Sequence, residues 1–211
     1  MRSIYFVLVM AVGLLLPSAH AVAGTDFLLS ANVGFNETDY EDIGEEYTVD
    51  VDKVAVSSRF YPTDQYYLAG TYSSGNGKVE QLEFDMTEMS VGVGIVMLNR
   101  VNYRSGAGHE LRLGLSYVEA ERDYKLGSTE EAWTDVNIGY TAGLDYGFSG
   151  FAEYKANIEH FDDNAYFLIG VTKHIAAGLL VRAGFEARVI DLEDNASSTM
   201  SGFHMGAGYA F

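Results

Sequence analysis

The sequence of 211 residues contains no cysteine, so disulfide bonds, thiolate metal sites and a cysteine nucleophile are all excluded. Proline occurs only twice, at positions 17 and 62, and a chain with so few breakers can hold many extended segments. No run approaches the roughly 18 apolar residues that mark a membrane-spanning helix, which excludes a helical membrane protein. Basic residues are also scarce, 13 against 30 acidic ones, and a net charge of −17 argues against a nucleic-acid partner.

Glycine and aromatic residues are abundant instead, with 23 Gly, 15 Tyr and 12 Phe, which favours strands and turns. The amino-terminus combines a basic start at Arg2, an apolar run over residues 4–16 and a break at Pro17. Small residues then offer cleavage after Ala21 or Ala23, and the two alternatives remain open. We therefore predict a secretory signal peptide over residues 1–23 and one domain over residues 24–211. A retained anchor helix is the alternative, but the apolar run is short for it.

The domain shows a repeating alternation of side chains with a period of two residues, which is typical of β-strands. One face of each segment is bulky and apolar, and the other carries Gly, Ser, Asn and charged residues. We predict an all-β fold with strands near 27–37, 47–61, 66–73, 89–98, 110–118, 135–146, 151–161, 165–172, 178–190 and 201–211.

The last segment shows the pattern most clearly. Phe203, Met205, Tyr209 and Phe211 share one face, while the opposite face is almost entirely glycine beside His204. Such a strand suits an apolar face against lipid and a small face toward a narrow lumen. We predict a single antiparallel transmembrane up-and-down β-barrel with ten strands. An eight-stranded barrel, with segments 66–73 and 89–98 placed elsewhere, is the alternative; a soluble lipocalin-like barrel needs a bulkier interior.

The connections between the predicted strands alternate in length and charge. Those at one end, over 37–46, 74–88, 119–134, 162–164 and 191–198, are mostly long and hold most of the acidic residues. Those at the other end are short, except for 99–109. The acidic loops either form a solvated rim or bind divalent cations that bridge to lipopolysaccharide. The apolar register changes near Asp52 and Lys53, which predicts a β-bulge there.

Charged residues on the small-side-chain face form the second feature. Charges enclosed in a narrow lumen must pair, because an unpaired buried charge costs several kcal/mol. The sequence therefore predicts a lumen filled by ion pairs, with a selective channel as the alternative. The predicted network comprises Asp50, Asp52, Arg59, Glu110, Arg112, Asp145, Glu153, Lys155, Glu159, Arg182, Glu186 and Arg188.

Catalytic motifs are weak. The pair Asp50 and Asp52 with the pair His160 and Asp162 distantly resembles the omptin proteases, but the order is reversed and omptins are longer. No zinc-ligand spacing, phosphate loop or nucleophile elbow is present. We predict no catalytic residues, no cofactor and no metal site, and we interpret Trp133 as an aromatic residue at the membrane interface.

In its strand pattern, signal peptide and terminal Phe211, the chain resembles the small bacterial outer-membrane β-barrel family that includes the OmpA barrel domain and OmpX. This resemblance implies a location in the outer membrane of a Gram-negative bacterium and contacts with its lipid and lipopolysaccharide. It also implies a monomer and an assembly signal, at Tyr209 and Phe211, that the barrel-assembly machinery reads. The expected function is non-enzymatic, in envelope structure, surface interaction or adhesion. A narrow porin-like channel is the alternative, and an omptin-like or lipid A-modifying enzyme is the third possibility.

Overall fold

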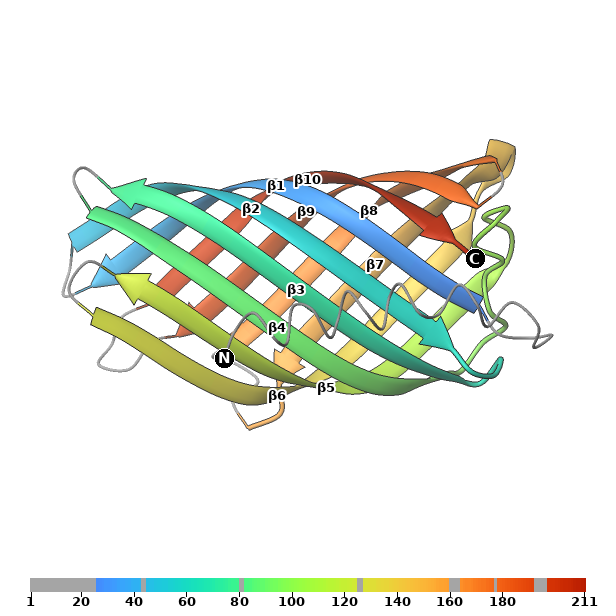
Figure 1. Cartoon of the computed structure of the whole chain (residues 1–211), viewed down its shortest axis with the longest axis horizontal. Coiled ribbons are helices and arrows are strands. Elements are labelled where there is room, and N and C mark those ends of the chain that lie inside the picture. The colour runs from blue at the N-terminus through green and yellow to red at the C-terminus, as the bar shows by residue number, and fades with distance from the viewer. Residues whose placement is uncertain are drawn as a thin grey trace.

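The computed structural model describes residues 26–42, 45–79, 82–124, 127–159, 164–176, 178–191 and 197–211. Within these ranges ten antiparallel strands close into a barrel, each strand pairing with its sequence neighbours and β1 pairing with β10 (Figure 1). This confirms the predicted up-and-down barrel with ten strands, and the eight-stranded alternative is wrong. The predicted signal peptide lies outside the described residues. The elements are β1 (Asp26–Asp42), β2 (Glu45–Tyr61), β3 (Tyr66–Val79), β4 (Leu82–Val96), β5 (His109–Tyr124), β6 (Gly127–Gly143), η2 (Asp145–Gly147), β7 (Phe148–Asn157), β8 (Asn164–Ala176), β9 (Leu179–Asp191) and β10 (Ser197–Ala210).

The strands run further than the sequence predicted at one end, which we call the outer end. The predicted polar loop 74–88 is instead a hairpin of β3 and β4, paired without a break from Tyr66 with Ile95 to Val79 with Leu82. The predicted loops over 37–46 and 119–134 are strand in the same way, except for the two residues at each turn that are not described. Backbone pairing satisfies the peptide groups of these polar segments, so their composition does not prevent strand formation.

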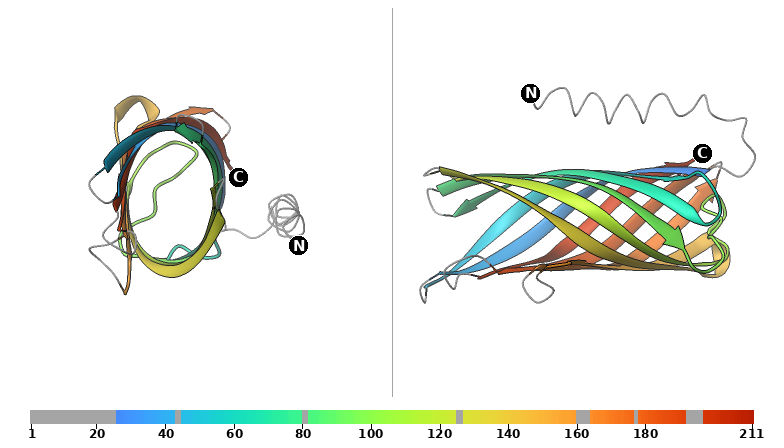
Figure 2. Two further views of the ribbon diagram at one scale, coloured as in Figure 1. Left: turned by 90° about the vertical axis from the view of Figure 1, so that its left-hand side faces the viewer. Right: turned by 90° about the horizontal axis from the view of Figure 1, so that it is seen from below.

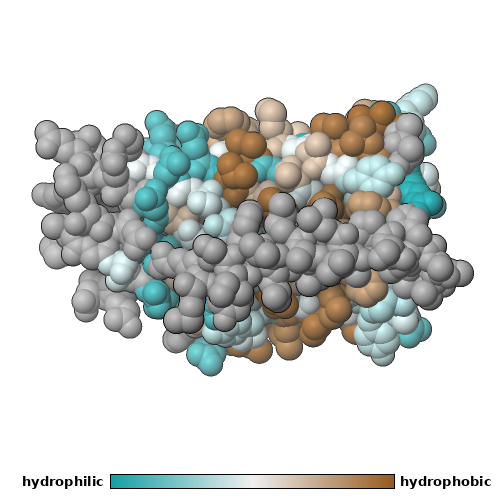
Figure 3. Space-filling view, in the orientation of Figure 1, coloured by the Kyte–Doolittle hydropathy of each residue, from teal (hydrophilic) through white to brown (hydrophobic). Residues whose placement is uncertain are grey.

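A belt of apolar side chains surrounds the half of the barrel nearer the chain's carboxy-terminus. Figure 3 shows brown residues gathered in this half of the visible face, with teal, hydrophilic residues toward both ends. Phe203 is 70% exposed, Val93 56% and Leu115 48%, and all three point away from the barrel axis. Side chains of this kind are buried in a soluble protein, so their exposure in a closed barrel indicates that this half faces lipid.

Beyond the belt, the two faces of β2 and β5 exchange their character. On β2, Val49 and Val51 are buried inside the barrel and pack against Met86, whereas Asp50 and Asp52 are exposed on the outside. On β5, Val118 and Ala120 are buried, whereas Glu119 is exposed. We call this part of the strands the outer wall, comprising residues 36–42, 45–53, 74–79, 82–88, 118–124, 127–134 and 197–201. Its interior combines apolar side chains with buried polar ones such as Lys53 and Arg122, and its exterior carries acidic residues.

The exchange of faces explains the register change that the sequence shows at Asp52 and Lys53. Both residues pair in unbroken register, with Phe35 and Gly34 of β1 on one side and with Asn76 and Gly75 of β3 on the other. The predicted β-bulge is therefore wrong, because the apolar side chains change faces where the surroundings change from lipid to water. A register irregularity does occur in β8, between His174 and Ala176.

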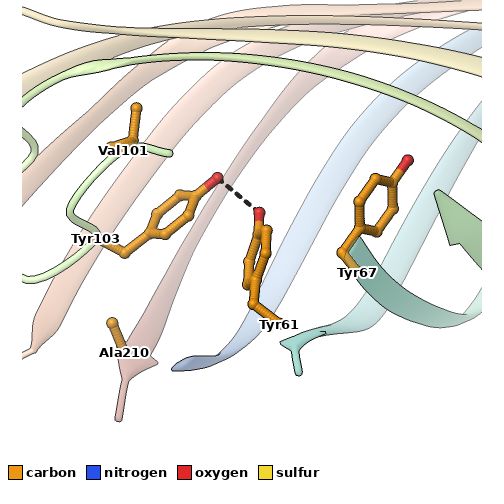
Figure 4. Close-up of a cluster of buried hydrophobic side chains, with 5 residues drawn as sticks. All are labelled: Tyr61, Tyr67, Val101, Tyr103 and Ala210. Atoms are coloured by element: carbon orange, nitrogen blue, oxygen red, sulfur yellow. Dashed lines mark hydrogen bonds between the residues drawn. The ribbon is translucent and has the colours of Figure 1, made fainter. Parts of the chain in front are cut away.

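The opposite end, which we call the base, is where β1 begins and β10 ends (Figure 1). Here residues 97–108, the connection between β4 and β5, turn into the barrel and cross its bore, as the light-green loop in the left view of Figure 2 shows. We call this segment the base loop. Val101 is completely buried and Tyr103 is 8% exposed, and both pack with Tyr61 and Tyr67 (Figure 4). In the described part of the chain, no helix is long and apolar enough to cross a membrane.

Candidate functional site

The bore is closed at the base by a cluster centred on Glu110 of β5. Its side chain is completely buried and forms an ion pair with Arg112, which the two-residue period of the strand places on the same face. One carboxylate oxygen accepts hydrogen bonds from the hydroxyls of Tyr61 and Tyr103, at 2.9 and 2.7 Å. The other accepts the backbone N–H of Val101 at 3.2 Å. The base loop is therefore held to the barrel by a buried charge.

Tyr103 takes part in this cluster as a neutral donor. Burial of its hydroxyl raises its pKa above the ordinary value, although the neighbouring Arg112 opposes that rise. Its hydroxyl donates to Glu110 and also lies 3.1 Å from the hydroxyl of Tyr61 (Figure 4). A protonated phenol can satisfy the carboxylate without adding a second negative charge.

His174 fixes the same loop from β8. One ring nitrogen lies 2.7 Å from the carbonyl oxygen of Tyr103, and the other lies 2.9 Å from the hydroxyl of Ser149. A carbonyl accepts only, so the first nitrogen donates and the second accepts from the serine. Gly106 of the loop adopts φ of 76° against this ring, where a Cβ would approach the imidazole to 2.4 Å. Ser149 and His174 are both buried and hold the base loop in place.

Above the base, a second layer is organised by Glu153 of β7. A single carboxylate oxygen accepts hydrogen bonds from Arg59 and from Arg112, each at 3.0 Å. Arg59 also lies over the ring of Tyr67, 5.7 Å from its centroid. Gly139 makes room for this arrangement, because a Cβ there would lie 2.7 Å from the guanidinium of Arg112.

The third layer lies toward the outer end. Glu186 of β9 pairs with Lys53 at 3.6 Å and accepts the hydroxyl of Tyr166 at 3.0 Å. Lys155 lies over the Tyr166 ring, 5.3 Å from its centroid. These contacts join β2, β7, β8 and β9 across the bore.

The uppermost layer joins Arg188 of β9 to Glu88 of β4 by an ion pair. The guanidinium lies 5.5 Å from the ring centroid of Trp133, whose indole nitrogen donates to Asp135 at 2.8 Å. Trp133 therefore faces the lumen, which corrects its interpretation as an interface residue. Between this layer and the base lies a cavity of about 170 Å³, which polar and apolar side chains line together.

Of the twelve predicted network residues, the structure places eight in the lumen: Arg59, Glu110, Arg112, Glu153, Lys155, Arg182, Glu186 and Arg188. The other four are exposed to solvent. Asp50 and Asp52 lie outside the barrel because of the exchange of faces in the outer wall. Asp145 lies in the turn η2, and Glu159 follows the end of β7. These four assignments are corrected.

Sequence reasoning missed several members of the lumen. Lys53 was assigned to a bulge, and Glu88 to a loop, so neither was placed on an inward face. The lumen also contains the hydroxyls of three tyrosines, Tyr61, Tyr103 and Tyr166. The strand pattern does not identify them, because tyrosine is also common in the aromatic belts at the membrane interfaces. A search of the strand pattern extended through 74–88 would have found Glu88.

The geometry of the described residues does not bring the candidate catalytic residues together. Asp50 and Asp52 are on the outer surface of the wall, and His160 and Asp162 lie outside the described residues. Among the residues that the structure covers, no group of three or more His, Cys, Asp or Glu side chains could hold a metal ion.

A closed antiparallel barrel with outward apolar side chains and inward charges satisfies its backbone internally and offers lipid an apolar surface. The protein is an outer-membrane β-barrel. The outer-membrane barrel has its base, with the start of β1 and the end of β10, on one side of the apolar belt, and its outer wall on the other side.

Several solved structures of other proteins are similar to this barrel. Neisserial surface protein A is 12% identical with a TM-score of 0.47, over 88% of this chain and 97% of that one. The attachment invasion locus protein Ail of Yersinia pestis is 15% identical with a TM-score of 0.41, over 88% and 99%. The outer-membrane protease OmpT from Escherichia coli is 12% identical with a TM-score of 0.49, over 90% and 97%. No family model and no curated protein matches the chain. Such low similarity assigns no activity to it.

Proposed function

We propose that this protein is a non-enzymatic outer-membrane barrel with a closed lumen. Its outer wall would serve in envelope structure or in interaction at the cell surface. The observation that carries this proposal is the buried Glu110 cluster, which binds the base loop across the bore. A barrel closed in this way at its base is poorly suited to solute passage. The part that remains available for a function is the wall outside the membrane.

The outer wall is longer than membrane insertion needs. About 9–11 residues suffice for a tilted membrane-spanning strand, whereas β1, β2 and β6 each have 17. The additional residues continue the strand pairing without a break in register, and on β2 Val49 and Val51 pack against Met86, so we infer that the wall is rigid. Rigid elements hold surface groups in fixed positions, which favours recognition over simple solvation.

The exterior of the wall is acidic. Glu37 of β1 and Asp50 of β2 are directly opposite each other and both are exposed. Like charges in such cross-strand pairs destabilise a sheet, and a cationic partner would relieve the repulsion. We infer that the wall contacts basic groups at the cell surface, above the lipid and lipopolysaccharide that surround the belt. Barrel assembly through the final strand and a monomeric state belong to the same proposal.

A narrow channel is the second candidate, because the cavity of about 170 Å³ lies within the bore. It requires the base loop to move, and the Glu110 and His174 contacts oppose that movement. An omptin-like activity has less support, because Asp50 and Asp52 lie on the outer surface of the wall and do not face a common cleft.

Planar-bilayer recording separates the first two candidates. We expect the purified wild-type protein to show no steady conductance of porin size. A variant in which residues 99–107 are replaced by a short Gly-Ser linker and Glu110 by Ala should conduct. Glu119→Ala, an exposed outer-wall change, is the control and should behave as wild type. Steady wild-type conductance would overturn the closed-lumen proposal and favour the channel.

Cell adhesion tests the role of the wall. Bacteria that display the wild type should adhere to a polylysine-coated surface more strongly than bacteria displaying the triple variant Glu37→Gln, Asp50→Asn, Asp52→Asn. A control variant replaces two neutral residues on the exterior of the wall, Thr48 and Thr199, by Ser. Equal adhesion of the wild type and the neutralised variant would contradict a wall that meets basic groups and leave a structural role.

A further inference from the structure

The cavity contains a histidine without a hydrogen-bond partner. His204 of β10 is 8% exposed and lines the cavity, and neither of its ring nitrogens has a partner among the described residues. Burying an unsatisfied polar group costs free energy, so native proteins pair nearly all of them. Gly184 of β9 lies opposite, where a Cβ would come within 2.6 Å of the ring. Gly184 thus makes room for the imidazole, and both ring nitrogens are available for hydrogen bonds with a bound molecule.

Arg182 lies beside this histidine on the neighbouring strand. It pairs with Gly206 in the β9–β10 register, two positions from His204, and also lines the cavity. Its guanidinium lies over the ring of Phe151, 4.2 Å from the centroid, and its Nε has no hydrogen-bond partner. Within the described part of the chain, no carboxylate forms an ion pair with it.

The charges in this part of the lumen do not balance. The guanidinium groups of Arg59 and Arg112 form ion pairs with Glu153 and Glu110, whereas Arg182 interacts with Glu153 only at longer range, without an ion pair among the described residues. With Arg182, this part of the lumen holds three guanidinium groups and two carboxylates, in a chain whose net charge is −17. An uncompensated charge inside a barrel is costly, and a bound anion would remove that cost.

We propose that the lumen contains a binding site for a small anion, formed by Arg182 and His204. The guanidinium supplies two parallel N–H donors, which match the two oxygens of a carboxylate or an oxyanion. The imidazole supplies a third donor, and the face of Phe151 bounds one side of the site. The ligand class is a compact carboxylate or inorganic oxyanion, since a cavity of roughly 150 Å³ accommodates a molecule the size of benzene.

The route to this site is from the outer end. The base loop and the Glu110 cluster close the opposite side, whereas the cavity extends outward to Glu88 and Arg188. An anion that enters past this ion pair meets Lys53 and Lys155 before it reaches Arg182. The site goes beyond the proposed surface role and does not need a conducting lumen.

Calorimetric titration of the refolded mature chain in detergent tests the proposal. Sodium acetate and sodium phosphate are titrated separately, and the ionic strength of each ligand solution is matched to that of the protein solution. We expect saturable binding of one anion per chain. The two titrations distinguish a carboxylate ligand from an oxyanion ligand, and saturable binding of either supports the site. Arg182→Met should weaken binding at least tenfold, and His204→Leu several-fold.

Two controls keep the result interpretable. Arg104→Met removes an exposed guanidinium of the base loop and should bind as wild type. Arg182→Lys retains the charge but loses the paired donors, so its affinity should lie between those of the wild type and Arg182→Met. Heat-modifiable gel migration shows whether each variant is folded. Absence of saturable binding to the folded wild type, or equal binding by folded Arg182→Met, would overturn the site.

Discussion

Replacement of Glu110 by Ala tests the closure of the lumen at its base. The change removes the acceptor of two tyrosine hydroxyls and one backbone N–H, and it leaves Arg112 with Glu153 as its remaining carboxylate partner. Removing one partner of a buried ion pair costs about 3–5 kcal/mol. Because Glu153 still pairs with Arg112, we expect a loss near the lower limit, about 3 kcal/mol, in the free energy of unfolding.

The assay is reversible urea unfolding in lipid vesicles, followed by the fluorescence of Trp133, the only tryptophan of the chain. Glu110→Gln keeps an oxygen acceptor and loses the charge, so its loss should be smaller, about 1–3 kcal/mol. Glu119→Ala, on the exposed face of the same strand, should stay within about 0.5 kcal/mol of the wild type. If Glu110→Ala also stayed within that range, the cluster would not hold the base closed.

Three further changes test other contacts. Gly139→Val places a side chain against the guanidinium of Arg112, which lies 2.7 Å from the Cβ position. It should destabilise the barrel by about 1–3 kcal/mol in the urea assay. An unchanged midpoint of urea unfolding would contradict the tight packing. His174→Ala releases the carbonyl of Tyr103 and should speed tryptic cleavage at Arg104 in the folded barrel, whereas cleavage at the wild-type rate would show that His174 does not hold the loop. Burial raises the folded-state pKa of Tyr103, so its neutral form contributes stability that is complete below about pH 10 and is lost as pH rises through the folded pKa. Tyr103→Phe should therefore lose less stability than the wild type between pH 9 and pH 12, and parallel pH profiles would refute this.

The fold was largely predictable because lipid imposes a strict pattern. A bilayer favours apolar side chains outside a barrel, so segments such as 89–95 and 202–211 alternate larger apolar side chains with mostly small ones. Closure follows from the need to pair every backbone group, and an even number of strands brings both ends of an up-and-down barrel to the same side. These constraints are local in sequence and leave a period-two signal that can be read from one chain.

The outer wall was not predictable in the same way. A period of two tells which residues share a face, but it does not tell which face is inside. Val49 and Val51 therefore appeared to belong with Val54 across a bulge, although they lie inside the barrel and Val54 lies outside. The missing information is the position of the membrane boundary along each strand.

The base loop and the pairing of the lumen charges were also beyond sequence reasoning. Residues 97–108 have no periodic pattern, and their inward path depends on Glu110 and His174, which come from other segments. Which acid meets which base depends on the stagger of the strands. Arg188, for example, pairs with Glu88 across the bore, and these residues are distant in the sequence.

The most direct test of the account is to measure which side chains face lipid and which face water. Because the chain has no cysteine, a spin label can be attached to a single introduced cysteine in Val93→Cys, Asp52→Cys or Ala120→Cys. In lipid vesicles, the label at position 93 should collide with dissolved oxygen, the label at 52 with a water-soluble nickel chelate, and the label at 120 with neither. A label at 93 that the chelate reaches, or a label at 52 that lies in lipid, would contradict an apolar belt beneath a wall with exchanged faces.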